Sequence, residues 1–214
     1  GYIYSGPIAA SAYRLLKKHP NKIKRVLLFG PAHRMAFSGL ALSRAECFST
    51  PLGDITIDLP SRQKIENLPQ THYLERAHEA EHSLEVHLPF LQTVLEDFTL
   101  LPILVGDAKP TDVSEVIETL WGEPDSLIVI SSDLSHYQDY ATAQRLDKAT
   151  SRAIEELRLE DIDYEHACGR NPIRGLLWFA QKHNLHIHTL DLRNSGDTAG
   201  TKDRVVGYGA YSVE

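Results

Sequence analysis

The stretch Ile128–Tyr137, IVISSDLSHY, joins an apolar run to a cluster of serine, aspartate and histidine. Its first three residues are β-branched and apolar, which predicts a buried strand that ends at the polar cluster. The same order occurs earlier, where the apolar run Val26–Phe29 leads into the sequence GPAH that ends at His33. Ligands of open α/β sheets bind beyond the carboxyl ends of strands. We therefore expect His33 and His136 to contribute to one shared site.

Predicted strands and helices alternate along the 214 residues. The expected strands are Val26–Phe29, Leu40–Phe48, Asp54–Asp58, Thr99–Val105, Ser126–Ile130, His186–Leu192 and Arg204–Val213. The expected helices are a first helix with Ser5 as N-cap that runs to Leu16, then Ser61–Asn67, His82–Asp97, Thr111–Leu120, Tyr140–Leu157, Asp161–Ala167 and Pro172–Lys182. This alternation predicts an α/β fold: a single domain with a mixed central sheet, helices packed on its faces and two antiparallel closing strands.

Composition excludes several classes of protein. The net charge of -7 argues against a nucleic-acid-binding surface, which requires clustered Lys and Arg. Apolar runs stay well below the roughly 18 residues of a membrane span, so no membrane association is expected. The two cysteines, Cys47 and Cys168, form no motif pair. We therefore expect a reducing compartment and a cytoplasmic protein.

Residues Glu79–His87, EAEHSLEVH, place three carboxylates and two imidazoles within nine positions. Such a cluster is usually a solvated helix face. If His82 instead points inward, it reaches the strand-end site and can act there as an acid or base. The spacing of His82 and His87 differs from the His-Glu-x-x-His zinc signature.

Asp133 and His136 lie three positions apart, and a helical turn between them would direct both side chains into one cavity. An aspartate there can accept the second N–H of an imidazole and fix its tautomer. The neighbouring hydroxyls of Ser131, Ser132 and Ser135 leave a hydrolase open, although the chain has no Gly-x-Ser-x-Gly motif. The alternative for Ser131 and Ser132 is that they cap the following helix.

Cys168 begins the segment CGRNP between two predicted helices. A lone cysteine is more often a small buried apolar residue than a ligand. Here the neighbouring Arg170 and the flexible Gly169 favour the thiolate, which is the form that binds metals. Cys47 lies within a predicted strand and is interpreted as structural.

Five motifs, taken together and in order, resemble the Memo family. They are GYIYSG (1–6), GPAH (30–33), EHSLEVHLP (81–89), SSDLSHY (131–137) and CGRNP (168–172). The resemblance implies a fold similar to that of the type III extradiol (LigB-like) dioxygenases, which open catechol rings with non-haem Fe(II). It also implies a functional association with a radical-SAM protein.

The resemblance implies a metal site in which His33 and Cys168 are ligands and His136 lies at the metal. Asp133 and His82 correspond to polar residues around the pocket, so His136, His82 and Asp133 are the expected catalytic residues. Mixed His/Cys ligation suits Fe(II), Cu or Zn, and Fe(II) is the favoured ion.

The resemblance also implies a further histidine ligand just before Gly1. We therefore expect residues 1–214 to be one Memo-like domain that lacks its N-terminal strand and the residues before it. A second departure is Arg34, where many relatives carry another histidine, a change that alters the charge of the pocket.

Three functions follow as hypotheses. The first is a metal-dependent redox enzyme of the dioxygenase type, with a small-molecule or peptide ligand in the metal cleft. The second is a metal- or peptide-binding module without turnover, because a dioxygenase fold alone does not establish dioxygenase activity. The third, and weakest, is a metal-free hydrolase that uses Ser132 or Ser135 with His136.

Overall fold

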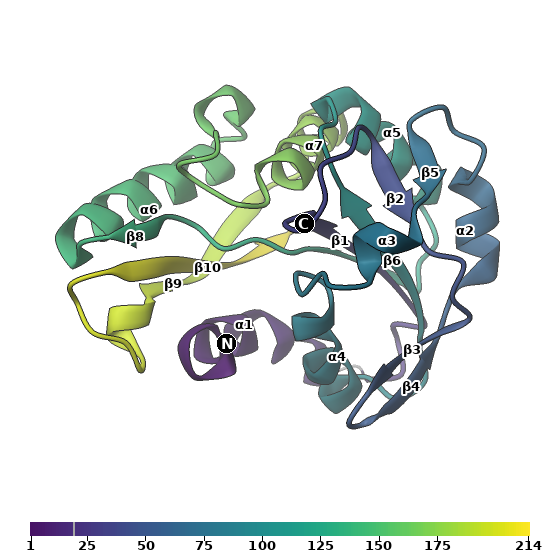
Figure 1. The fold of residues 1–214 in the computed structure, drawn as a ribbon, viewed down its shortest axis with the longest axis horizontal. Helices are drawn as coiled ribbons and strands as arrows, with labels where there is room; N and C mark the ends of the chain where they lie inside the picture. Colours follow the sequence, from purple (N-terminus) through teal and green to yellow (C-terminus); the bar gives the residue numbers. More distant parts are fainter. Residues whose placement is uncertain (19) are drawn as a thin grey trace.

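A five-stranded sheet forms the centre of the computed structural model, which describes residues 1–18 and 20–214 (Figure 1). Its strand order is β5-β2-β6-β1-β7. The bounds, in that order, are Thr71–Tyr73, Leu40–Leu42, Thr99–Val105, Arg25–Pro31 and Ser126–Ile130. Strand β1 is parallel to β6 and β7, whereas β2 is antiparallel to β6. The predicted mixed central sheet is therefore confirmed.

The inner strands β1 and β6 are buried on both faces, as expected for strands covered by helices on both sides. Alternate residues of β1 enter different cores. Val26 and Leu28 pack with Leu88 of one core, whereas Leu27 and Phe29 pack in the other. Continuous apolar runs in the sequence therefore produced correct strand predictions for β1, β6 and β7.

Helices cover these faces. They are α1 (Tyr2–Tyr13), α2 (Leu59–Ile65), α3 (Glu75–His78), α4 (Leu88–Val94), α5 (Pro110–Leu120), α6 (Tyr140–Glu155) and α7 (Arg170–His183). Short 3-10 helices lie at η1 (Leu16–Lys18), η2 (Glu85–His87), η3 (Leu159–Asp161) and η4 (Ser195–Asp197). In the part of the chain that the structure describes, no helix combines the length and apolar character needed to cross a membrane.

A second sheet has the order β8-β10-β9, with bounds His136–Gln138, Val205–Val213 and Ile187–Asn194. In Figure 1 the ribbon of β9 and β10 extends away from the central sheet, with α6 along one side and α1 along the other. The two closing strands are antiparallel, as predicted, but they form a sheet of their own. The sequence pattern did not predict β8, which is short and lies within the polar cluster.

Two local expectations were wrong. Helix α1 begins at Tyr2 and is not capped by Ser5, because the Ser5 N–H already donates to the Gly1 carbonyl. The predicted strand Leu40–Phe48 is split into β2 and β3 (Cys47–Thr50), since the Glu75 carboxylate accepts the Ser43 hydroxyl and the Arg44 N–H. The turn that follows it does connect a hairpin of β3 and β4 (Gly53–Thr56).

Of two further predicted helices, one is shorter than expected and one is absent. The segment His82–Asp97 contains only η2 and α4, with Pro89 in the first turn of α4. The predicted helix Asp161–Ala167 is absent, and η3 ends at Asp161. There the Asp163 carboxylate accepts the Glu165 N–H, a side-chain turn that competes with helix formation.

Candidate metal centre

The candidate centre lies where β1 and β7 end side by side. The two strands are parallel neighbours, and the Ser131 N–H donates to the Phe29 carbonyl at 2.8 Å. His33 follows β1, and Ser131–Asp133 follows β7. The sequence therefore correctly indicated which strand ends meet.

The carboxylate of Glu81 holds His33 in place, and the Glu81 side chain is only 2% exposed. It accepts the His33 backbone N–H at 2.5 Å and lies 2.8 Å from the His33 Nδ1. It also accepts the backbone N–H groups of His82 and Ser83, both at 2.9 Å. Burial alone would raise the pKa of Glu81, but the hydrogen bonds from His33 and Ser83 outweigh it and lower the pKa to about 2.

His33 therefore has a fixed ring orientation. With Nδ1 on Glu81, its Nε2 is the nitrogen left for a further partner. Side-chain hydrogen bonding with Cys168, and then with Glu81, raises the pKa of His33 to about 10. The His82 ring stacks on the His33 ring, with centroids 5.0 Å apart. A carboxylate behind an imidazole is the arrangement that orients histidine ligands of metals.

A neighbouring group consists of Asp133, His136 and Cys168, all partly buried. One potential ligand atom from each lies within 4.8 Å of the others. The Asp133 backbone N–H donates to the Cys168 Sγ at 3.1 Å, and His136 Nε2 lies 3.6 Å from Asp133 Oδ2. Hydrogen bonding with Asp133 raises the pKa of His136, against the opposing effect of burial. The Cys168 thiol and the His136 imidazole therefore both lie next to Asp133.

Two glycines permit these close approaches. A Cβ at Gly30 would lie 2.7 Å from the Leu84 Cδ2 and 2.8 Å from the Ser83 Oγ. A Cβ at Gly169 would lie 2.5 Å from the Ser131 carbonyl oxygen. Only glycine lets the segment after Glu81 pack on β1 and the segment of Cys168 pack on the end of β7.

Serine hydroxyls join the segments around the centre. Ser131 Oγ donates to the Ser83 carbonyl at 2.7 Å, and Ser83 Oγ donates to the Pro31 carbonyl at 2.8 Å. Ser132 Oγ accepts the Gly169 N–H at 2.9 Å. The predicted capping role of Ser131 and Ser132 is therefore wrong, because Asp139 caps α6 instead.

The expected helical turn between Asp133 and His136 is also absent. The Leu134 N–H donates to the Gly207 carbonyl, and the Gly207 N–H donates to the Ser135 carbonyl, both at 2.8 Å. These bonds keep the chain extended and start β8 at His136. Within residues 1–18 and 20–214, no hydrogen bond joins His136 to Ser132 or Ser135, so nothing in the geometry supports a hydrolase.

The sequence-predicted residues fall into the two groups that the described residues contain. His33 and His82 form one with Glu81, and Asp133, His136 and Cys168 form the other. The two groups adjoin because β1, which leads to His33, and β7, which leads to Asp133, are paired neighbours. Glu81 was not predicted as a site residue, because a carboxylate within a cluster of three resembles an exposed helix face.

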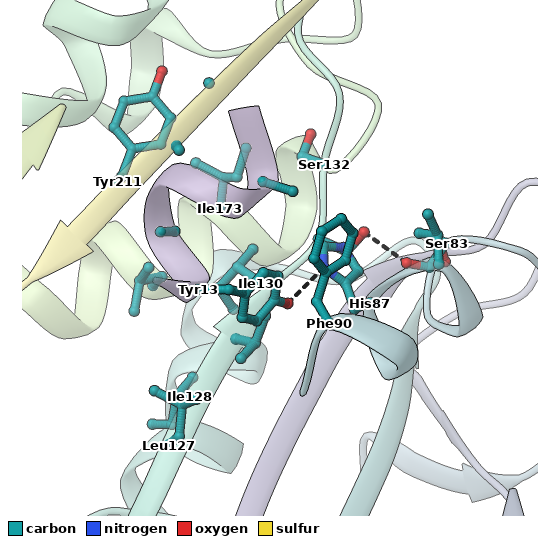
Figure 2. Close-up of a pocket in the computed structure, with 18 of the residues that line it drawn as sticks. Tyr13, Ser83, His87, Phe90, Leu127, Ile128, Ile130, Ser132, Ile173 and Tyr211 are labelled. Carbon is teal, nitrogen blue, oxygen red and sulfur yellow. Dashed lines mark hydrogen bonds between the residues drawn. The ribbon is translucent and has the colours of Figure 1, made fainter. Parts of the chain in front are cut away.

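A cavity of about 1360 Å³ opens from this centre into the molecule. Its polar end includes His33, Ser132 and Cys168. Deeper inside, the Tyr13 hydroxyl lies 2.7 Å from His87 Nδ1, as the dashed line in Figure 2 marks. Burial lowers the pKa of His87 to about 4, so this imidazole is neutral at pH 7. His87 therefore adds no charge to the interior of the cavity.

The Glu81–His33 pair predicts a pH dependence of stability in the presence of a chelator. The pKa of Glu81 falls from 4.5 to about 2, so its contribution is lost as the pH drops through that range. The pKa of His33 rises from 6.5 to about 10, so its contribution is lost as the pH rises through that range. Urea unfolding of the native protein and of Glu81→Gln should differ most between pH 4.5 and 6.5. A difference that is constant from pH 2 to 10 would contradict the assignment.

The comparisons with known proteins agree on one family. A family model described as Memo-like protein matches residues 1–212. A MEMO1 family protein of Methanosarcina acetivorans is 37% identical over 228 residues, covering 100% of this chain and 83% of the relative. One of Aquifex aeolicus is 35% identical, covering 97% and 80%. One of Metallosphaera sedula is 31% identical, covering 97% and 78%.

The fold agrees with these matches, because a mixed central sheet flanked by helices is consistent with the similarity of this family to type III extradiol dioxygenases. The five motifs noted in the sequence all lie within the matched residues. The chain therefore belongs to the Memo-like family.

Proposed function

We propose that this protein binds a transition metal between the two adjoining groups, with His33, His136 and Cys168 as ligands. The observation that carries the proposal is the geometry of the two groups: Glu81 holds the His33 ring through Nδ1, and Asp133, His136 and Cys168 each place a potential ligand atom within 4.8 Å of the others. A carboxylate-supported imidazole beside a thiol suits Fe(II), Cu or Zn better than Mg or Ca. His82 and Asp133 complete the polar wall around the ion.

The residues fit such an ion on chemical grounds. Imidazole and thiolate are both ligands of transition metals, and here they lie at partly open positions where a small molecule can enter from the cavity. A bound Fe(II) would supply redox chemistry toward dioxygen. His82, whose ring stacks on that of His33, is placed to hold a proton next to a bound substrate.

We further propose a redox enzyme of the dioxygenase type, with Fe(II) as the favoured ion and a small-molecule or peptide ligand in the cleft. The fold relationship of the family supports this reaction class. A binding module without turnover is the second candidate, because a thiolate ligand such as Cys168 would change the electronic properties of the ion.

Oxygen consumption separates the two candidates. We expect the Fe(II)-loaded protein to consume dioxygen with at least one member of a catechol panel, above the rate of an equal concentration of free Fe(II). A His82→Gln variant that still binds iron should lose most of this rate, while the exposed-residue control His186→Gln should keep it. If the loaded native protein consumes no more dioxygen than free iron with any catechol, the binding-module function stands instead.

A further inference from the structure

Tyr137, the residue after the proposed ligand His136, has a strained backbone. Its φ angle of 59° lies in the left-handed region, which a bulky side chain rarely adopts. Among the described residues other than glycine, Leu157 and Asn184 also have a positive φ. Both follow the last turn of a helix, α6 and α7 respectively, where this conformation is common. Tyr137 belongs to the strand β8, so its conformation needs another explanation.

A bulge in the pairing of β8 with β10 accounts for this conformation. Val205 pairs with Gln138, and the next residue of β10, Val206, pairs with His136. Tyr137 is therefore the extra residue of β8 at this point. Bulges redirect side chains and are frequent next to active sites. Here the redirected side chain is that of the residue following His136.

The bulge places the Tyr137 ring beside the His136 ring, where it is open to solvent. The two ring centroids are 5.7 Å apart, and the ring planes meet at 70°. Tyr137 is 64% exposed. The guanidinium of Arg204 lies over the Tyr137 ring, 5.0 Å from its centroid, and supports it from one side. Among the described residues, those that line the cavity do not include Tyr137, so its ring lies outside the cavity.

The fold itself gains little from a tyrosine at this position. Glycine would adopt the left-handed conformation without strain, and an exposed ring removes little apolar surface from water. Backbone strain of this kind is concentrated at active sites and ligand contacts. An exposed tyrosine offers a ligand the face of its ring, and a second aromatic ring gains most from such a contact.

We propose that Tyr137 is a specificity-determining residue, which stacks on the ring of a planar aromatic substrate bound beside His136. The proposal rests on the metal site proposed above, because the polar end of the substrate would bind at that centre while its ring contacts Tyr137. An aliphatic ligand with the same polar end would gain nothing from the tyrosine. Stacking and the burial of apolar surface together correspond to about tenfold in affinity.

The test compares two probes that share a metal-binding group. Benzohydroxamate carries a phenyl ring, whereas acetohydroxamate carries a methyl group. Titration of each probe into the Co(II)-loaded protein, followed through the Co(II) absorption, gives the two dissociation constants. Tyr137→Gly should weaken the binding of benzohydroxamate about tenfold and leave that of acetohydroxamate unchanged. Tyr137→Phe keeps the ring and should bind both probes as the native protein does.

Urea unfolding distinguishes this role from a structural one. Glycine relieves the strain at position 137, so Tyr137→Gly should unfold at a urea concentration at least as high as that of the native protein. A variant that is equally stable but no longer prefers benzohydroxamate has lost a substrate contact. Asn184→Gly is the matched control, because it places glycine at an exposed left-handed residue at the far end of α7. It should bind both probes with native affinity.

Three results in these variants would overturn the proposal. Unchanged binding of benzohydroxamate by Tyr137→Gly would mean that the ring does not contact the ligand. Equal changes for both probes would mean that the ring controls access to the centre without selecting its ligand. A lower urea midpoint would assign the ring to the stability of the fold. If the native protein binds no Co(II), the metal site itself is wrong and this inference fails with it, a result that is seen before either probe is added.

Discussion

Replacing Cys168 by serine is expected to weaken the binding of Co(II) or Fe(II) at least about a hundredfold. A ligand contributes more than the residues that support it, whose loss typically costs 10–100-fold. The Cys168 Sγ accepts the Asp133 N–H and belongs to the group of potential ligands with Asp133 and His136, so a serine hydroxyl occupies the same place without the soft thiolate. Titration of the EDTA-treated protein with Co(II), followed through the thiolate-to-metal absorption band, measures the loss.

The chain provides a matched control for this variant. Cys47 is an exposed free cysteine in β3, and it belongs to neither group of potential ligands. Cys47→Ser should therefore keep both the absorption band and the native affinity. If Cys168→Ser binds Co(II) as tightly as the native protein does, the thiol is not a ligand and the proposed site is wrong.

Glu81→Gln is expected to reduce metal affinity by about 10–100-fold while leaving the fold intact. The amide has nearly the same shape as the carboxylate, and its oxygen can still accept one of the backbone N–H groups. It loses the negative charge that orients the His33 ring through Nδ1. The imidazole is then free to rotate, and part of the binding free energy is spent on ordering it.

Glu79 is the control for this second variant because it is an exposed carboxylate two positions away. Glu79→Gln changes the net charge by the same amount and should leave the affinity within about twofold of the native value. Circular dichroism confirms that each variant is folded before the titration. Equal losses in Glu79→Gln and Glu81→Gln would mean that general charge, rather than the position of the imidazole, controls affinity.

The sequence predicted β1, β6 and β7 from local pattern, whereas β5 was not predicted and β2 was expected as part of a longer strand. Strand β7 was expected at Ser126–Ile130 and lies there, but its residues are only partly buried instead of fully buried as predicted. The meeting of His33 with the end of β7 also followed from a general rule of parallel sheets. Cys168 was placed at the site through the family resemblance, because no local pattern connects it to β7.

The parts that were missed depend on contacts between distant segments. Glu81 becomes a site residue only when the chain brings it to the His33 backbone, 48 positions away. Strand β8 exists because Gly207 pairs with Leu134 and Ser135, and its three residues carry no strand pattern of their own. The separation of β9 and β10 from the central sheet is likewise decided by pairing, which periodicity does not specify.

The residues of the candidate centre come from four distant parts of the chain, and this arrangement has a thermodynamic consequence. An unfolded polypeptide keeps His33, Glu81 and Cys168 far apart, so it offers an ion no ready-made coordination sphere. Free energy gained by coordination is then available only to the native state, which becomes more populated as the free ion concentration rises above the dissociation constant. The supply of the metal would thereby regulate how long the protein survives proteolysis as well as whether its centre is loaded.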